Sequence, residues 1–213
     1  MAQRRRALGH TAAASHVFLE EMAAPGPAGP VGEDVLEDAA QTLLLSADRT
    51  DGGFGKAPKF PRFSVLLFLA AFQQHSGDRE VLHQFGSALQ AMLRGGIFDQ
   101  AGGGICRYAV DSAWTVPHFE KMLPENGMLL RTLAAAQAIA PSEEWAHAAH
   151  VTFGWLEREM RLPSGAYASA LSADTDGVEG ATYLWTREQL AGALTADEMA
   201  LAARELGVEG EPH

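Results

Sequence analysis

The pattern of apolar and polar positions along the chain is mainly helical. Apolar residues recur every three or four positions in several segments, as they do on the buried face of a helix. The predicted helices span residues 35–44, 63–75, 79–94, 125–140, 142–160, 187–194 and 196–206. Asp78 is expected to cap the third helix, which Gly95-Gly96 ends, and Pro141 separates the fourth from the fifth. Residues 181–186 are rich in β-branched and aromatic side chains and predict a strand.

Long loops separate pairs of these helices and open on a similar phrase. The phrases are Gly52-Gly53-Phe54, Gly95-Gly96-Ile97-Phe98 and Gly165-Ala166-Tyr167. Their spacing lies near the length of a helical hairpin repeat, roughly 40–50 residues or somewhat more. One hairpin has too little core of its own and must stack on its neighbours. The sequence therefore predicts a mainly α protein of stacked hairpins, with long loops and short β segments gathered on one rim.

The start of the chain has a different composition. Residues 25–30 alternate proline with glycine and alanine, which favours neither helix nor strand. We therefore expect residues 1–30 to be a lead-in and linker, and residues 31–213 to be one domain. A linker so close to the start suggests that another segment once preceded it.

Composition and charge narrow the classes of function. Hydrophobic residues make up 47% and charged residues 20% of the chain, which is a globular composition. The net charge of -11 argues against nucleic acid as a partner. The single cysteine, Cys106, excludes an internal disulfide and a CxxC pair, and it fits a reducing cytoplasm. No apolar run approaches the roughly 20 residues that cross a membrane, and no HExxH-type spacing suggests a metal, so we expect neither membrane, metal nor cofactor.

The glycine-rich stretch 95–123 concentrates polar and aromatic groups. Such groups suit a sugar or polyol, because aromatic faces stack on C–H bonds while carboxylates and arginine bind hydroxyls. The candidate substrate-binding residues are Asp99, Arg107, Tyr108, Asp111 and Trp114. Each also has a structural interpretation: Arg107 can satisfy loop carbonyls, and Trp114 can plug the core.

The candidate catalytic residues are His118, Glu120, Asp174 and Asp176. His118 can act as a general base, because histidine titrates near neutrality, or it can pin its loop by hydrogen bonds. Glu120 can be an acid or a member of an ordinary ion pair. Asp174 and Asp176 can form a carboxylate pair for acid–base work or cap turns beside glycine.

Three motifs resemble those of one known family. Residues 95–123 are similar to the motif GGI-D--GGGF-RY--D--W--PHFEKML of the spermatogenesis-associated protein 20 family. Residues 51–61 resemble its DGGFG-APKFP motif, and residues 173–186 resemble its DAD…EG…Y-WT stretch. The similarity runs in order from about residue 31 to about residue 206, and three long motifs in sequence are a specific signal.

The resemblance implies a fold and an activity. Members of the family carry a thioredoxin-like domain ahead of an α/α toroid related to N-acylglucosamine 2-epimerases and six-hairpin glycosidases. It implies that this chain is a partial α/α toroid without the thioredoxin-like domain and the later hairpins. The implied chemistry is sugar isomerisation or epimerisation, in which His118 moves a proton, Arg107 and Tyr108 orient the substrate, and Asp174 or Asp176 assists.

Departures from the family pattern keep two alternatives open. Ile105-Cys106, Pro124-Glu125 and Ser172 differ from the residues usual in the motifs. The chain can therefore be a non-catalytic binding scaffold, or an inactive truncated fragment. The sequence leaves the substrate and the oligomeric state open.

Overall fold

The computed structural model describes residues 15–20, 22–24 and 32–206. The chain divides into two units, residues 1–38 and residues 39–213. In the first unit residues 15–20 are helical. Helix α2 (Glu33–Ser46) runs across the boundary between the units. The predicted linker at residues 25–30 lies outside the described residues, as does most of the predicted lead-in.

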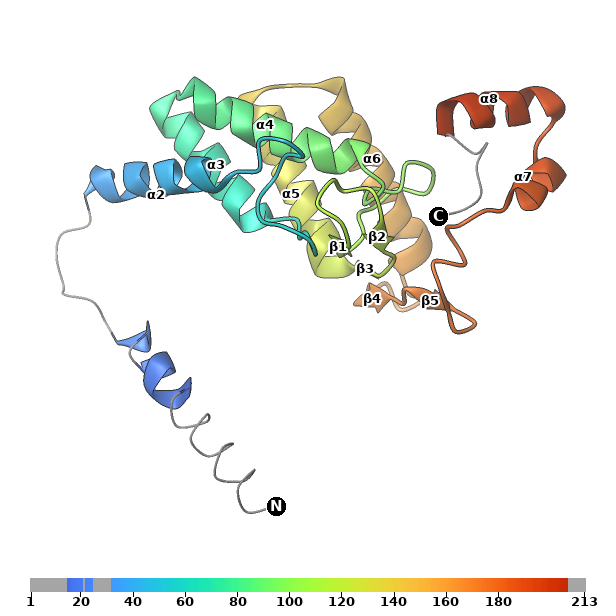
Figure 1. Cartoon of the computed structure of the whole chain (residues 1–213), viewed down its shortest axis with the longest axis horizontal. Helices are drawn as coiled ribbons and strands as arrows, with labels where there is room; N and C mark the ends of the chain where they lie inside the picture. Colours follow the sequence, from blue (N-terminus) through green and yellow to red (C-terminus); the bar gives the residue numbers. More distant parts are fainter. Residues whose placement is uncertain (1–14, 21, 25–31, 207–213) are drawn as a thin grey trace, which may run out of the picture. The chain divides into compact units, whose positions relative to one another are not determined.

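The second unit is mainly helical (Figure 1). Its helices are α3 (Phe63–Ser76), α4 (Arg79–Arg94), α5 (Leu123–Ile139), α6 (Glu143–Trp155), the π-helical turn η1 (Leu156–Met160), α7 (Arg187–Ala193) and α8 (Ala196–Leu206). The described residues of the long loops form six short strands: β1 (Tyr108–Ala109), β2 (Pro117–His118), β3 (Lys121–Met122), β4 (Ala170–Leu171), β5 (Asp174–Thr175) and β6 (Val178–Glu179). The strands pair as antiparallel couples, β1 with β2, β3 with β4 and β5 with β6.

Local capping fixes several helix boundaries. The Asp78 carboxylate accepts hydrogen bonds from the backbone amides of Glu80 and Val81, which confirms the predicted cap of α4. Ser142 caps α6 in the same way. Thr186 forms a capping box with Gln189 at the start of α7, so two orphan amides are satisfied reciprocally.

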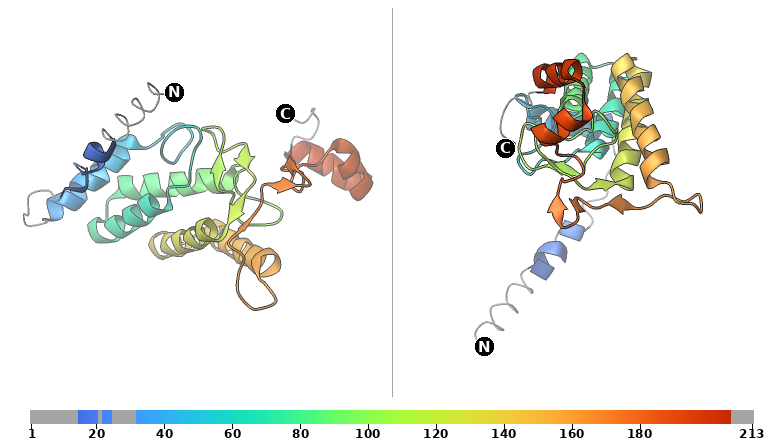
Figure 2. Two further views of the ribbon diagram at one scale, coloured as in Figure 1. Left: turned by 90° about the horizontal axis from the view of Figure 1, so that it is seen from below. Right: turned by 90° about the vertical axis from the view of Figure 1, so that its right-hand side faces the viewer.

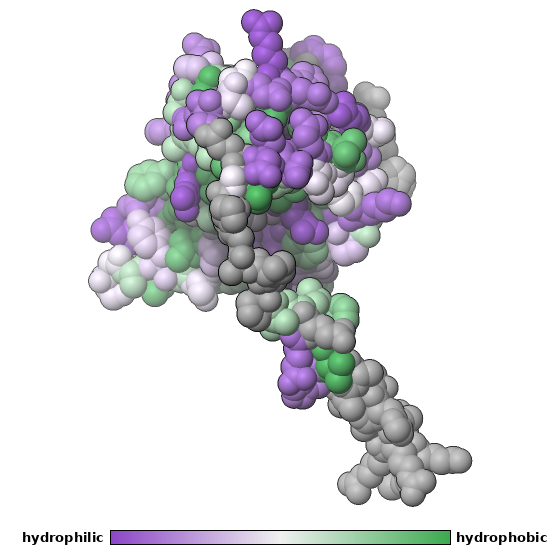
Figure 3. Space-filling view, turned by 90° about the vertical axis from the view of Figure 1, so that its left-hand side faces the viewer, coloured by the Kyte–Doolittle hydropathy of each residue, from purple (hydrophilic) through white to green (hydrophobic). Residues whose placement is uncertain are grey.

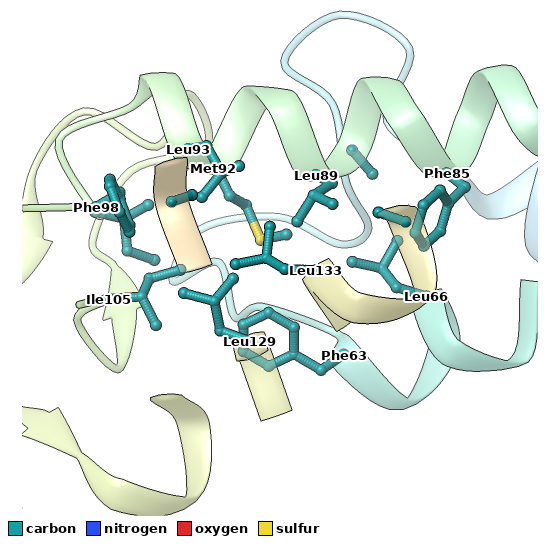
Figure 4. Packing of buried hydrophobic residues seen from close by; sticks show 14 of the residues in the cluster. Phe63, Leu66, Phe85, Leu89, Met92, Leu93, Phe98, Ile105, Leu129 and Leu133 are labelled. Atoms are coloured by element: carbon teal, nitrogen blue, oxygen red, sulfur yellow. The ribbon is translucent and has the colours of Figure 1, made fainter. Parts of the chain in front are cut away.

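The core lies between four helices. Helix α3 packs against both α4 and α5, and α5 packs against α6 (Figures 1 and 2). Figure 4 shows side chains from α3, α4 and α5 meeting, with Leu89, Leu129 and Leu133 at most 1% exposed. Phe98 and Ile105 reach the same cluster from the glycine-rich loop (Figure 4). Burial of apolar surface therefore fixes the loop as well as the helices.

The surface of the second unit is more polar than its core. The face drawn in Figure 3 is largely hydrophilic, with apolar side chains scattered among charged ones. No helix in residues 15–20, 22–24 and 32–206 combines the length and the apolar character needed to cross a membrane.

The predicted strand at residues 181–186 is wrong. Residues 181–183 form a turn, and residues 184–186 have no regular structure before α7. The amides of Tyr183 and Leu184 both donate to the carbonyl of Gly180, which has a φ of 75°. This turn leaves the segment without a strand partner, and Tyr183 instead stacks on Phe119 with ring centroids 5.5 Å apart.

The first two long loops contain the same aspartate turn. In the first loop, Asp48 Oδ1 accepts from the amides two and three residues ahead, and the Asp48 amide donates to the carbonyl of Gly53. In the second loop, Asp99 makes the same three bonds, the last with the carbonyl of Gly104. The third loop has a shorter turn, in which the amide of Leu162 donates to the carbonyl of Ala166 four residues ahead instead of five, and leucine stands in place of the aspartate.

A buried lysine closes each of the first two turns. Lys59 Nζ lies 2.6 Å from Asp48 Oδ2, and Lys121 Nζ lies 2.7 Å from Asp99 Oδ2. Both lysine side chains are 0% exposed, and each ammonium sits 5.0 Å from the centre of a tryptophan ring. We call each set an aspartate–lysine unit: Asp48, Lys59 and Trp114 form the first, and Asp99, Lys121 and Trp155 form the second.

The two aspartate–lysine units differ in the number of residues between the aspartate and the lysine. The aspartate and the lysine are 11 residues apart in the first unit and 22 residues apart in the second. The longer connection contains strands β1 and β2. The second aspartate–lysine unit therefore has the same arrangement as the first, with a β-hairpin inserted between its aspartate and its lysine.

Candidate functional site

Most of the candidate site residues lie in two groups at the long loops, and Asp111, Trp114 and Asp176 belong to neither. One group surrounds His118, and we call it the histidine cluster. Its members are Phe60, Arg107, Tyr108, His118, Glu120 and Glu179. The other group lines a cleft beside the second aspartate–lysine unit, and it includes Asp99 and Asp174 but not His118.

The inserted hairpin builds the histidine cluster. Strands β1 and β2 pair Tyr108 directly with His118. Their rings stack with centroids 4.8 Å apart and planes 18° apart, and the ring of Phe60 lies 4.8 Å from that of Tyr108 with planes 33° apart. The Tyr108 ring thus contacts two other rings, and exposed ring surface of this kind suits the C–H face of a sugar.

Carboxylates lie on both sides of the His118 imidazole. His118 Nδ1 lies 2.7 Å from Glu179 Oε1, within hydrogen-bond distance. His118 Nε2 lies 3.8 Å from Glu120 Oε2, which is beyond it. Arg107 Nη1 donates to Glu120 Oε2 at 2.9 Å. When Nδ1 carries the proton and donates to Glu179, Nε2 presents a lone pair and can accept a proton.

Glu179 was not among the residues predicted from the sequence. It enters the cluster through the β5–β6 hairpin, which pairs Asp174 with Glu179. Asp176 and Gly177 form the turn, with φ values of 53° and 80°. An aspartate–glycine turn between two short runs is a hairpin signal in the sequence, so the position opposite Asp174 could have been found.

Asp176 has a turn role in this hairpin. Its left-handed backbone conformation is one that aspartate tolerates better than most residues with a side chain. Asp174 instead faces the cleft, so the hairpin separates the two carboxylates that the sequence analysis grouped together.

Two predicted substrate-binding residues have structural roles. Asp111 accepts hydrogen bonds from the backbone amides of Ala113, Thr115 and Val116. Partial burial tends to raise the pKa of Asp111, but these amides outweigh burial and lower it. Trp114 is 1% exposed and its Nε1 donates to the carbonyl of Gly52. Both side chains thus have partners within the fold, and their substrate-binding roles stay predictions.

The cleft has a volume of about 520 Å³. It is lined by Asp99, Ala101, Gly102, Lys121, Trp155, Arg158, Glu159, Leu171, Ser172, Asp174, Thr175, Thr182, Tyr183 and Trp185. The volume lies within the roughly 300–1,000 Å³ range of small-molecule sites.

Burial and the lysine set the protonation states around the cleft. Burial tends to raise the pKa of Asp99, but the Lys121 ammonium and two backbone amides lower it overall, so the carboxylate is ionised near neutrality. Burial raises the pKa of Tyr183 to about 12 and that of the nearby Cys106 to about 11. Tyr183 is therefore a neutral donor, and Cys106 is a poor nucleophile.

The acidic and histidine side chains of the site were compared with the requirements of a metal site. The part of the chain that the structure describes contains no group of three or more histidine, cysteine, aspartate or glutamate side chains that could hold a metal ion.

Comparison with solved structures defines the class of the fold. The cellobiose 2-epimerase of Spirochaeta thermophila superposes with a TM-score of 0.55 at 20% identity, covering 67% of this chain and 40% of that one. A D-mannose isomerase superposes with a TM-score of 0.52 at 16% identity, covering 69% and 41%. The domain therefore has the α/α toroid fold, which confirms the predicted fold class.

Sequence comparison identifies the relatives. No protein-family model matches the chain. Spermatogenesis-associated protein 20 of Rattus norvegicus is 35% identical over 164 residues, which cover 70% of this chain and 20% of that protein. The human protein of the same name is 33% identical over 175 residues, covering 76% and 22%. The chain is thus a homologue of the spermatogenesis-associated protein 20 proteins, which confirms the resemblance, and it spans about a fifth of the length of these relatives.

Proposed function

We propose that the histidine cluster moves a proton on a sugar or polyol, in the manner of an isomerase or epimerase. The observation that carries the proposal is the placement of His118, whose Nδ1 is bound to Glu179 while Nε2 has no hydrogen-bond partner among the residues that the structure describes. A carboxylate on one ring nitrogen fixes the tautomer and stabilises the imidazolium that forms when the other nitrogen takes a proton.

The reaction proceeds without a net change of oxidation state. His118 Nε2 removes a proton from the carbon beside the sugar carbonyl, and the electron pair of that C–H bond forms an enediolate. The Arg107 guanidinium and the Tyr108 hydroxyl stabilise the developing negative charge on oxygen. Return of that proton from His118 to the former carbonyl carbon, with the hydroxyl proton exchanged through water, gives the isomer. Protonation of the original carbon by water on the opposite face, with the proton of His118 passing to solvent, gives the epimer.

The fold adds support by analogy. Two proteins that share the toroid are named as a cellobiose 2-epimerase and a D-mannose isomerase. Because one fold can host many activities, this likeness supports the class of substrate less strongly than the geometry of His118 supports the proton transfer.

Solvent exchange tests the chemistry. The chain is incubated with neutral aldoses and ketoses in D₂O, and deuterium at the carbon beside the carbonyl is followed by NMR. We expect incorporation with at least one sugar, and a decrease of about 10²–10⁴-fold in His118→Asn. Glu179→Gln should weaken the reaction less, because it leaves the imidazole in place.

His147→Asn, on the exposed surface of α6, is the matched control and should exchange at the wild-type rate. Absence of deuterium in every sugar, with a folded wild-type chain, would exclude the isomerase proposal.

A binding scaffold without catalysis is the second candidate. It is favoured by the same contact, because the His118–Glu179 hydrogen bond ties β2 to the β5–β6 hairpin and would suffice to hold the loops together. A protein partner that is retained by both His118→Ala and Asp174→Ala in a pull-down would support it, provided that no sugar exchanges.

The cellular setting belongs to the same proposal. A cytoplasmic location fits the single, buried cysteine, and the match to one fifth of a longer relative fits a toroid portion of such a protein. Microscopy and fractionation of the tagged protein in its own cell would test the location.

A further inference from the structure

The two aspartate–lysine units provide an internal comparison for the cleft. In the first unit, Lys59 Nζ donates to Asp48 and to the carbonyl of Ser112, and Trp114 covers it. In the second unit, Lys121 Nζ donates to Asp99 and to the carbonyl of Gly103, under Trp155. In both aspartate–lysine units the ammonium group is therefore paired and hydrogen-bonded within the fold, without a ligand.

The second aspartate–lysine unit has a further neighbour, Tyr183, which has no counterpart in the first unit. The ring of Tyr183 lies 4.8 Å from Lys121 Nζ, and both residues line the cleft. Tyr183 is held by its stacking on Phe119, and its hydroxyl makes no hydrogen bond with any residue that the structure describes. A half-buried neutral hydroxyl beside an open cleft can therefore donate to a ligand.

The charges of the cleft argue against an anionic ligand. The lining contains two cationic side chains, Lys121 and Arg158, and both are already paired, with Asp99 and with Glu159 at 2.7 and 2.8 Å. The carboxylate of Asp174 is a third negative group in the lining. A phosphate would meet a net negative wall with no cation released to bind it.

Hydroxyl and aromatic groups supply the remaining contacts. Ser172, Thr175 and Thr182 line the cleft from the segment that follows β4. The indole of Trp185 lines it as well and is 56% exposed, although large apolar side chains are usually covered. An exposed indole beside several hydroxyls and a carboxylate can stack on a sugar ring and bind its hydroxyls at the same time.

We infer that this cleft is a subsite for an uncharged sugar ring or polyol, stacked on Trp185 and hydrogen-bonded by Tyr183 and Asp174. The inference rests on the proposed function for the class of ligand, and it adds that phosphorylated sugars are excluded. The subsite is distinct from the histidine cluster, since His118 and Glu120 are absent from its lining.

The β5–β6 hairpin connects the subsite with His118. Asp174, on β5, lines the cleft, and Glu179, its register partner on β6, holds the imidazole. A ligand bound against Asp174 therefore contacts the element that orients the base. Occupation of the cleft should change the chemical shifts of the His118 ring.

Calorimetric titration of the full chain tests the subsite. The probes are neutral aldoses, ketoses and polyols, each compared with its 6-phosphate where one exists. We expect at least one neutral sugar to bind and its phosphate to bind about tenfold or more weakly. Trp185→Ala should weaken binding about tenfold, and Trp185→Phe should recover part of it.

Phe153→Ala is the matched control, because Phe153 is 55% exposed on α6 and does not line the cleft. Wild-type binding by Trp185→Ala, stronger binding of a phosphate than of its neutral sugar, or no binding by any probe would overturn the subsite. Binding that depends on Trp185 without any deuterium exchange would keep the subsite and exclude the isomerase instead, so the two failures are distinguishable.

Discussion

At the scale of single residues, Asp111 shows how a polar side chain can stabilise its own loop by hydrogen bonds to the backbone. Its carboxylate accepts from three backbone amides of its own turn. Replacing it in Asp111→Ala leaves these amides without that acceptor, and we expect a loss of about 2–3 kcal/mol in the free energy of unfolding. At roughly 2–4 °C per kcal/mol the thermal midpoint should fall by several degrees.

Asp111→Asn retains one acceptor oxygen and should lie between Ala and the wild type in a thermal melt. Asp174→Asn is the control, since its carboxylate is exposed and the change should stay within about 0.5 kcal/mol. Equal stability of Asp111→Ala and the wild type would contradict the structural role.

Cys106 provides a second test at this scale. Burial raises the pKa of its thiol to about 11, so at pH 8 the thiolate is a minor species as well as a covered one. We expect native protein to react with an aromatic disulfide reagent far more slowly than protein unfolded in guanidinium, which should release one equivalent. Equally fast reaction of the native chain would contradict the buried position.

Residue types predicted which side chains gather at the candidate site only in part. Arg107, Tyr108, His118 and Glu120 do lie together, because strand pairing brings nearby positions of one loop side by side. Their catalytic roles stay predictions. Glu179 escaped because its contact with His118 joins positions 61 residues apart. The backbone partners of Asp111 and Trp114 were not predicted, because a residue type does not reveal which hydrogen bonds the fold gives it.

At the scale of elements, the aspartate–lysine units should dominate local stability. Lys59→Met and Lys121→Met each leave a carboxylate beside a buried position without its cation, which typically costs about 3–5 kcal/mol. Lys56→Met, an exposed lysine of the first long loop, is the control and should change the urea midpoint little. A small effect of both buried substitutions would show that the ion pairs are dispensable.

Helices were easier to predict than strands for a physical reason. A helix satisfies its amides locally, so apolar periodicity and a capping residue such as Asp78 suffice to locate it. A strand needs a distant partner, and residues 181–186 have the composition of a strand without one. The repetition of the aspartate–lysine unit was not predicted either, because an insertion changes the spacing between its aspartate and its lysine from 11 to 22 residues.

At the scale of the whole molecule, acid should unfold the protein through several carboxylates together. The Lys59 hydrogen bond lowers the pKa of Asp48, and the Arg94 hydrogen bond lowers that of Glu144. The pKa values of Asp99 and Asp111 are lowered too, from an ordinary 3.8. Because the unfolded chain binds these protons more readily, their contribution is present above the ordinary values and is lost as pH falls through the folded ones.

Urea titrations at several pH values measure this dependence. The midpoint should be steady near neutrality and decrease between about pH 4.5 and pH 2. Asp99→Asn should flatten that decrease. A midpoint that rises on acidification would contradict the assignment.

The class of the whole fold was predictable because it rests on long motifs in order and on hairpin spacing, both of which tolerate local errors. The position of the cleft was not, because it forms where the segment after β4 meets the second aspartate–lysine unit, and no local pattern encodes that meeting.

The inserted β1–β2 hairpin has an evolutionary consequence. It holds His118, and the turn between its strands also supplies Trp114 and the Ser112 carbonyl that enclose Lys59 of the neighbouring unit. Selection for folding alone would therefore preserve much of this loop in a descendant that had lost all chemistry. Retention of the motif in a relative therefore indicates first that the fold is retained. Residues that the fold does not need, such as Arg107 and Trp185, can indicate whether that relative still uses the site.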